Sequence, residues 1–185
     1  MEQIVQFNSQ AKLSEHLASP SEAALSNLSE LNCVRLSPHF TLGEFTRSAS
    51  HPEVYNIPSH EAIANLKRVC TWLEELRKRG GEMPIIINSG YRSPQLNRAI
   101  GGVATSNHLT GCAVDIRVDG LEQLIVYAAI LLDISRDWQQ EFDELLIERR
   151  SASPLGSSKN KHGAMWLHFA VRQKDNRKKI LFINA

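Results

Sequence analysis

The sequence predicts an α+β fold in which a small, mainly antiparallel sheet is flanked by helices. Two long segments, residues 61–78 and 121–136, repeat apolar residues at the spacing of a helix with one buried face. Five short apolar runs have the length and the β-branched composition of strands. These runs are residues 84–88, 112–118, 142–148, 166–171 and 180–183. We expect the helices to cover one face of the sheet.

The composition is that of an ordinary globular protein. The chain has 185 residues, of which 42% are hydrophobic and 22% charged, and this suits one domain with an extension. The formal net charge of +1 argues against a nucleic-acid binder, because such proteins usually carry a strongly basic domain. Cys33, Cys70 and Cys112 lie in apolar surroundings and are predicted to be buried thiols. We expect a monomer.

The start of the chain does not have the pattern of a targeting signal. Residues 1–8 contain neither the basic start nor the apolar stretch of a signal peptide. No apolar run in the sequence approaches the length that spans a membrane, which argues against membrane insertion. We therefore expect the chain to be made and folded in the cytoplasm.

Residues 1–35 are predicted to form an N-terminal extension with a short helix, ahead of a domain over residues 36–185. Ser19 is a suitable N-cap, Pro20 suits the first helical position and Glu22 completes a capping box. The apolar stripe of this helix fits packing on the domain, and it also fits binding to a partner.

The elements that follow lead to a turn with a candidate functional arginine. Residues 36–58 contain three prolines and no sustained period, which predicts loops with short helical turns. The first long helix has Ser59 as its N-cap and stops at Gly80-Gly81. The next strand ends in a turn that carries Arg92. Its guanidinium could hold a substrate carboxylate or a developing oxyanion, although a surface arginine fits the same pattern.

The second half of the chain contains another helix and a long loop. Residues 94–100 are predicted to form a short helix. The second long helix is predicted to start at Leu121, to end before Asp137 and to be well buried, because its apolar stripe is wide. Residues 151–163 are rich in Ser, Gly, Lys and Asn, which is typical of a loop.

Two residues with strong metal-binding side chains, His108 and Asp115, lie seven positions apart. Asp115 belongs to a predicted buried strand, and Gly111 allows a sharp turn before it, so the two side chains can converge. His168, in another apolar run, is the best third ligand. Two imidazoles and one carboxylate suit zinc better than magnesium or calcium, which prefer oxygen ligands. Taken alone, the spacing also fits a helix cap, a turn or a surface ion pair.

Three motifs in one order give a resemblance to a known family. They are Leu36–Phe45 (LSPHFTLGEF), Asn88–Ser93 (NSGYRS), and Ser106-x-His108-x-x-Gly-x-Ala-x-Asp115 followed by Trp166-x-His168. The chain resembles the zinc D-Ala-D-Ala carboxypeptidase family (peptidase family M15) with its related peptidoglycan endopeptidases, and most of all the phage-type branch. The similarity covers roughly residues 36–172.

The resemblance implies a fold and a set of residue roles. The fold is the Hedgehog/DD-peptidase-like zinc fold, with Zn²⁺ held by His108, Asp115 and His168. Arg92 is implied to bind substrate and to stabilise the transition state. Ser106 is expected to orient His108 or to contact substrate, and an ordinary turn residue fits the same position.

One position departs from the family pattern. Many members carry the catalytic acidic residue three positions before the last histidine, where this chain has Met165. Glu148 is the predicted general base in its place, because a glutamate in this Leu-x-x-Glu setting recurs before Trp-x-His in the phage-type branch. Asp143 and Glu144 are competitors, expected to be exposed partners of nearby basic residues. His162 could hydrogen-bond the transition state, as a histidine near this point does in some members.

The resemblance implies an enzyme, a zinc metallopeptidase acting on peptidoglycan stem peptides or crossbridges as a D,D-carboxypeptidase or an endopeptidase. The alternative, motivated by Met165, is a catalytically inactive zinc-containing module that binds the cell wall. A structural zinc site is a third reading, although such sites normally have four protein ligands. A wall substrate requires the protein to leave the cytoplasm, and release in the manner of a phage or prophage lysin would achieve this.

Overall fold

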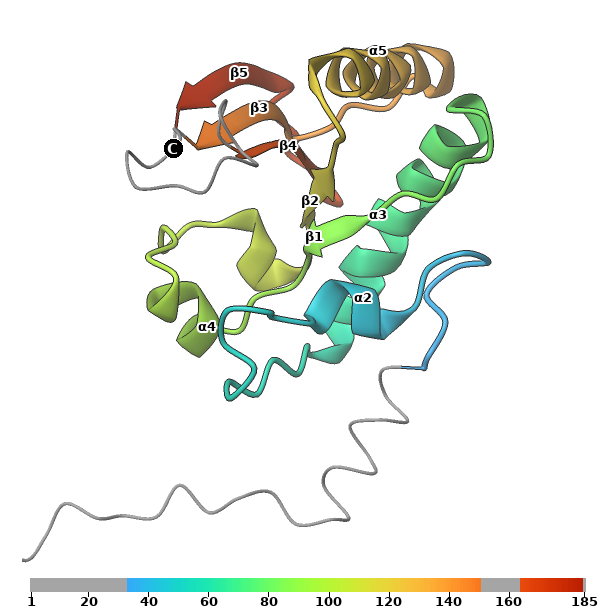
Figure 1. The fold of residues 1–185 in the computed structure, drawn as a ribbon. Coiled ribbons are helices and arrows are strands. Elements are labelled where there is room, and N and C mark those ends of the chain that lie inside the picture. Colours follow the sequence, from blue (N-terminus) through green and yellow to red (C-terminus); the bar gives the residue numbers. More distant parts are fainter. Residues whose placement is uncertain (1–32, 151–163, 185) are drawn as a thin grey trace, which may run out of the picture.

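The computed structural model describes residues 33–150 and 164–184 and has the predicted α+β architecture (Figure 1). Within these residues, no helix is long and apolar enough to cross a membrane. The predicted helix from Pro20 onward and the candidate residue His162 lie outside the described residues. The elements are α2 (Leu42–Thr46), α3 (His60–Arg79), β1 (Ile87–Ser89), α4 (Pro94–Ala99), η1 (Asn107–Thr110, a 3₁₀ helix), β2 (Ala113–Arg117), α5 (Leu121–Trp138), β3 (Glu144–Arg150), β4 (Ala164–Ala170) and β5 (Lys179–Asn184).

The five strands of the described chain form one sheet in the order β1-β2-β4-β3-β5. The pairs β1/β2, β2/β4 and β4/β3 are antiparallel, and β3/β5 is parallel. The parallel pair arises because β4 ends at Ala170 beside Glu144, and residues 171–178 then cross to the other side of Glu144, where β5 begins at Lys179. The sheet is therefore mainly antiparallel, as predicted.

Alternation along the strands gives the sheet one apolar face and one face with functional side chains. The long helices α3 and α5 pack together on the apolar face (Figure 1). Trp72 of α3 contacts Trp138 of α5 and Phe169 of β4, with ring centroids 5.2 Å apart in both pairs. Asp115 and His168 are directly opposite each other on the other face. The apolar face contributes Val114, Ile116, Leu145, Leu167 and Phe169 to the core.

Helix α3 confirms the predicted bounds within one residue at each end. The Ser59 hydroxyl accepts a hydrogen bond from the Ala62 amide at 3.1 Å, which is the predicted N-cap. At the other end the Gly80 amide donates to the Leu76 carbonyl at 2.8 Å. The helix forms the main wall of the core through Ala62, Leu66, Val69, Cys70, Trp72, Leu73 and Leu76.

The prediction for the second long helix is partly wrong. Helix α5 extends through Trp138 instead of ending before Asp137, and its wide apolar stripe is only half buried. The helix packs against α3 and β4 on one side, so the residues at the margins of the stripe face solvent. The exposed residues are Leu121, Ile125, Val126 and Leu132, at 38–55% of their maximal accessible surface.

Two smaller predictions also need correction. Strand β1 spans Ile87–Ser89, which is shorter than the predicted strand 84–88 and begins later. Its register with β2 is irregular, and a single hydrogen bond, from the Arg117 amide to the Ile86 carbonyl, extends the pairing before Ile87. Cys33 is exposed, since it lies outside the sheet at the start of the described chain, whereas the other two cysteines are buried as predicted.

Candidate metal centre and active site

The structure brings together the three predicted metal ligands, each from a different element. His108 lies on η1, Asp115 on β2 and His168 on β4. One side-chain ligand atom from each lies within 4.8 Å of the other two, and all three residues are buried. The contact between Asp115 and His168 follows from the antiparallel register, which pairs these two residues directly.

A tight turn after η1 delivers His108 to the strand ligands. Gly111 has φ +72°, in the left-handed region that favours glycine, and a Cβ added there would meet the Ala62 carbonyl oxygen at 2.5 Å. The Ser106 hydroxyl accepts from the His108 amide at 3.3 Å and caps the turn. The expectation that Gly111 permits convergence is therefore met. A contact of Ser106 with substrate stays a prediction.

Hydrogen bonds decide which atoms of the three side chains face one another. His108 Nδ1 lies 2.5 Å from the Gly90 carbonyl, and since a carbonyl can only accept, Nδ1 carries the proton. His108 Nε2 then faces His168 Nδ1 and Asp115 Oδ1, both at 3.3 Å. His168 Nδ1 lies 2.9 Å from Asp115 Oδ1. The facing set is two imidazole nitrogens and one carboxylate oxygen.

The electrostatics of this group favour a cation. Burial alone would raise the pKa of Asp115, but the charges and hydrogen bonds of His108 and His168 outweigh it and hold that pKa well below its ordinary range. Burial lowers the pKa of His108. Burial also acts to lower the pKa of His168, but its hydrogen bond with Asp115 and its close contact with Glu144 raise that pKa to about 9. The donor set fits Zn²⁺, and three protein ligands leave a coordination position for water or substrate.

Arg92 lies against the same group. Its Nη2 donates to Asp115 Oδ2 at 2.6 Å, and its Nε donates to the Ser89 hydroxyl at 2.9 Å. The Arg92 amide also donates to the His108 carbonyl at 3.1 Å, which ties the arginine turn to η1. Because Arg92 holds Oδ2 of Asp115, Oδ1 is the oxygen left to face the two imidazoles. The role of Arg92 towards substrate stays a prediction.

Glu148 lies on β3, on the same face of the sheet as His168. In the register, Leu146 is directly opposite His168 and Glu148 is opposite Trp166, so Glu148 is a diagonal neighbour of His168. Glu148 is half-buried. Its burial raises its pKa, the charge of Asp115 raises it further, and the charge of His168 opposes the rise. A raised pKa makes this carboxylate a better proton acceptor than an ordinary glutamate, which suits a general base.

The alternation of β4 also explains why Met165 is no obstacle to this arrangement. Met165 is an odd number of positions from His168 on the same strand, so it points to the opposite face. It packs against the apolar core. Glu148, on the neighbouring strand β3, is a carboxylate on the His168 face.

The two competing acidic residues are not exposed, contrary to the prediction. They do pair with basic residues, but Asp143 is fully buried between Arg172 and Arg177, with side-chain contacts of 3.1 and 2.6 Å. Glu144 is half-buried, and its contact with His168 Nε2 at 3.5 Å, followed by the hydrogen bond from Asn107, lowers its pKa to about 2. Both carboxylates are engaged, because the residues after β4 return beside the start of β3. Glu148 is the acidic residue on β3 without such partners among the ion pairs of the described chain.

The comparison with known families decides the family. The sequence model of Peptidase M15 matches residues 38–144, which is more than half of the chain. The chain belongs to the peptidase M15 family. It is also 32% identical over 78 residues to the zinc D-Ala-D-Ala carboxypeptidase of Streptomyces albus G. That match covers 42% of this chain and 31% of the relative, so the chain spans only about a third of the relative's length.

These matches confirm the family resemblance seen in the sequence. The placement of this M15 chain in the phage-type branch stays a prediction. His108 and Asp115 lie within the matched residues, whereas Glu148 and His168 lie beyond residue 144. The inclusion of the last two in the site therefore depends on the sheet register and on the distances given above.

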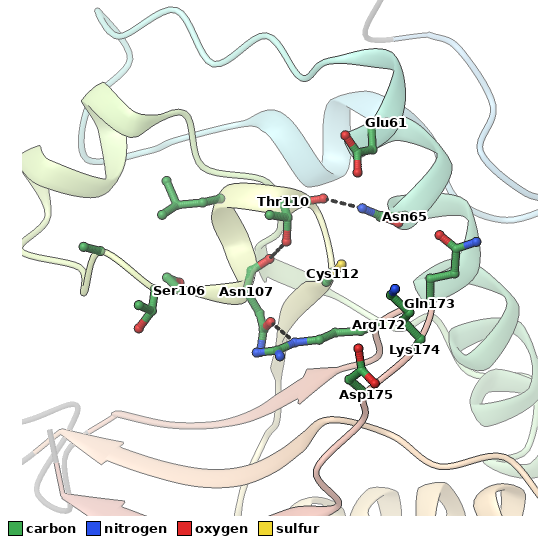
Figure 2. Close-up of a pocket in the computed structure, with 13 residues that line it drawn as sticks. Glu61, Asn65, Ser106, Asn107, Thr110, Cys112, Arg172, Gln173, Lys174 and Asp175 are labelled. Atoms are coloured by element: carbon green, nitrogen blue, oxygen red, sulfur yellow. Dashed lines mark hydrogen bonds between the residues drawn. The ribbon is translucent and has the colours of Figure 1, made fainter.

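The M15 chain also has a cavity of about 410 Å³ beside η1 (Figure 2). Figure 2 shows Arg172 donating to the Asn107 side chain at its centre, and the Asn65 side chain donating to the Thr110 carbonyl at its rim. The candidate metal ligands His108, Asp115 and His168 do not line this cavity, and Arg92 and Glu148 do not line it either. It is therefore a neighbour of the candidate metal centre and not the centre itself.

Sequence reasoning missed a buried polar cluster behind the metal group. Asn107, next to His108, donates to Asp143 at 2.7 Å and to Glu144 at 2.8 Å, and accepts from Arg172 at 2.9 Å. The available signal was an asparagine beside a candidate ligand, together with an excess of Lys and Arg after β3. Neither observation identifies which acidic residue the cluster holds.

Proposed function

We propose that the chain is a zinc-dependent peptidase that hydrolyses peptide bonds in peptidoglycan stem peptides or crossbridges. The observation that carries the proposal is the convergence of His108 Nε2, Asp115 Oδ1 and His168 Nδ1 beside a half-buried Glu148. Membership of the M15 family and the similarity to a zinc D-Ala-D-Ala carboxypeptidase support it. Both D,D-carboxypeptidase and endopeptidase activity are consistent with this site.

Each residue then has a defined task. His108, Asp115 and His168 would hold Zn²⁺, which when bound polarises the scissile carbonyl and acidifies a water molecule. Glu148 takes a proton from the attacking water and passes it to the leaving amine nitrogen. Arg92, already beside Asp115, directs positive charge towards the oxygen that becomes negative in the transition state.

The test combines bound zinc with product analysis on the same samples. Wild type, His108→Ala and Glu148→Gln are compared, with Glu141→Gln as an exposed, matched control from the loop before β3. We expect one zinc per chain in wild type, loss of zinc in His108→Ala, and retained zinc without cleavage in Glu148→Gln. The control keeps both properties. Mass spectrometry of digested muropeptides then identifies the bond that is cleaved.

Other outcomes would overturn parts of the proposal. A wild type that holds zinc and binds muropeptides without cleaving any of them is a cell-wall-binding module and not a peptidase. If wild type binds no zinc, the proposal that His108, Asp115 and His168 form a zinc centre is refuted. Peptidoglycan substrates also imply action at the cell wall, and we propose that the protein reaches it after release by a phage- or prophage-like route.

A further inference from the structure

We propose that Glu144 is a positioning residue for His168: its carboxylate accepts a hydrogen bond from His168 Nε2 and thereby keeps Nδ1 directed at the metal. The inference rests on the zinc site proposed above and adds a residue to it. Glu144 and Glu148 are both diagonal neighbours of His168 on β3, because they lie two positions before and two positions after Leu146.

The first observation is an incomplete hydrogen bond at a buried atom. His168 Nε2 is buried and forms no complete hydrogen bond within the described residues. Its contact is with Glu144 Oε2 at 3.5 Å, a few tenths of an ångström longer than a formed N–H···O bond. A buried ring nitrogen left without a partner costs free energy, so this N–H needs an acceptor. Glu144 is the acceptor that the fold places there.

The second observation is that the Glu144 carboxylate is fixed where it can only accept. Asn107 donates to its Oε2 at 2.8 Å, and Arg177 lies 2.8 Å from its Oε1. Lys179 adds a contact of 3.6 Å to Oε1. An ionised carboxylate has no proton to donate, so the facing nitrogen of His168 must carry one. In the metal-free protein Nδ1 also faces an ionised carboxylate, Asp115 Oδ1 at 2.9 Å, so it carries a proton there as well. A metal would displace the proton on Nδ1, because Nε2 keeps its own proton towards Glu144.

The third observation is that Nδ1 is the nitrogen that faces the other ligands. It lies 2.9 Å from Asp115 Oδ1 and 3.3 Å from His108 Nε2. His108 is fixed in the same manner, since its other nitrogen contacts the Gly90 carbonyl. Metal-binding histidines generally donate their second N–H to a carboxylate or carbonyl, and loss of that acceptor weakens metal binding by about 10- to 100-fold.

The test uses two readouts that do not depend on peptidase activity. Zinc-loaded full-length protein with ¹⁵N-labelled histidine reports by NMR which ring nitrogen of His168 binds the metal and whether the Nε2 proton is hydrogen-bonded. The rate of zinc release is measured separately, with an excess of chelator. We expect Glu144→Ala to release zinc at least about 10-fold faster and to lose the slowly exchanging Nε2–H signal. The amide oxygen of Glu144→Gln can still accept the hydrogen bond from Nε2. This variant should therefore restore most of the slow zinc release and most of the Nε2–H signal.

Glu148→Gln is the matched control, because Glu148 is the other diagonal neighbour of His168 on β3 and its charge also raises the pKa of His168. It should leave the His168 Nε2–H signal in place. Circular dichroism of the metal-free variants verifies folding. If Glu144→Ala does not fold, zinc-loaded wild type decides: a His168 that binds the metal through Nε2, or an Nε2 proton that exchanges freely with solvent, overturns the proposal. If wild type takes up no zinc, the proposed function is overturned together with this inference. If zinc-loaded wild type and Glu144→Ala release zinc at the same rate and show the same Nε2–H signal, this inference alone is overturned.

Discussion

Replacement of Gly111 by alanine should destabilise the fold and displace a metal ligand at the same time. Gly111 ends η1 with φ +72°, and its position brings the turn against the backbone of α3. An added Cβ would lie 2.5 Å from the Ala62 carbonyl oxygen, a distance that real Cβ atoms do not show. The contact is with backbone in the first turns of a long helix, so the loop carrying His108 has to move.

A second glycine in the chain separates the two contributions to this effect. Gly101 has nearly the same φ, +73°, but an added Cβ there meets nothing within 4 Å. Gly101→Ala therefore has only the cost of a left-handed alanine, about 1–2 kcal/mol before the opposing gain in chain stiffness. Gly111→Ala adds overpacking against α3, which typically costs about 1–3 kcal/mol more. For a chain of 185 residues, each kcal/mol lowers Tm by about 2–4 °C.

The assay is urea unfolding of both variants and wild type, followed by zinc titration of the folded proteins. We expect Gly111→Ala to have the lower unfolding free energy and the weaker zinc binding, and Gly101→Ala to bind zinc as wild type does. Equal unfolding free energies for the two variants would refute the steric argument. Undiminished zinc binding in Gly111→Ala would refute the claim that this turn positions His108.

Two further predictions concern charged groups. Asp143→Asn should lower the unfolding free energy, measured by urea unfolding, by about 2–4 kcal/mol. The loss is somewhat smaller than for a fully buried ion pair, because the partners Arg172 and Arg177 are partly exposed. In metal-free protein the pKa of His168 is raised from 6.5 to about 9, so its pairing with Asp115 stabilises the fold fully below about pH 6.5. That contribution is lost as the pH rises through about 9. Tm measured from pH 6 to 10 with chelator should fall, and His168→Asn should flatten the profile.

The candidate ligands could be predicted from the sequence because each signal was local. Asp115 and His168 lie in short apolar runs whose alternation defines two faces, and Gly111 marks a turn that no other residue makes easily. The bounds of α3 followed from Ser59 at one end and glycine at the other. In each case the information lay within a few residues of the feature.

Features that depend on distant segments could not be predicted. Asn107, Asp143 and Arg177 meet only because η1, the start of β3 and the segment before β5 converge in three dimensions. The exposed margin of α5 has the same origin: a wide apolar stripe gives no measure of how much surface the rest of the fold supplies to cover it. Burial of Asp143 was likewise decided by the path of the chain after β4.

The two glutamates of β3 connect the proposed chemistry with the proposed positioning. Glu144 and Glu148 are the same residue type on the same strand and are placed symmetrically about the position opposite His168. The contact with His168, followed by the hydrogen bond from Asn107 and the charge of Arg177, lowers the pKa of Glu144 to about 2, so it stays ionised. Burial raises the pKa of the other. Environments that drive the pKa values of two like groups apart are the usual mark of divided roles. On this argument the fixed carboxylate orients the ligand and the less restrained one moves the proton, and exchanging their partners should exchange their roles.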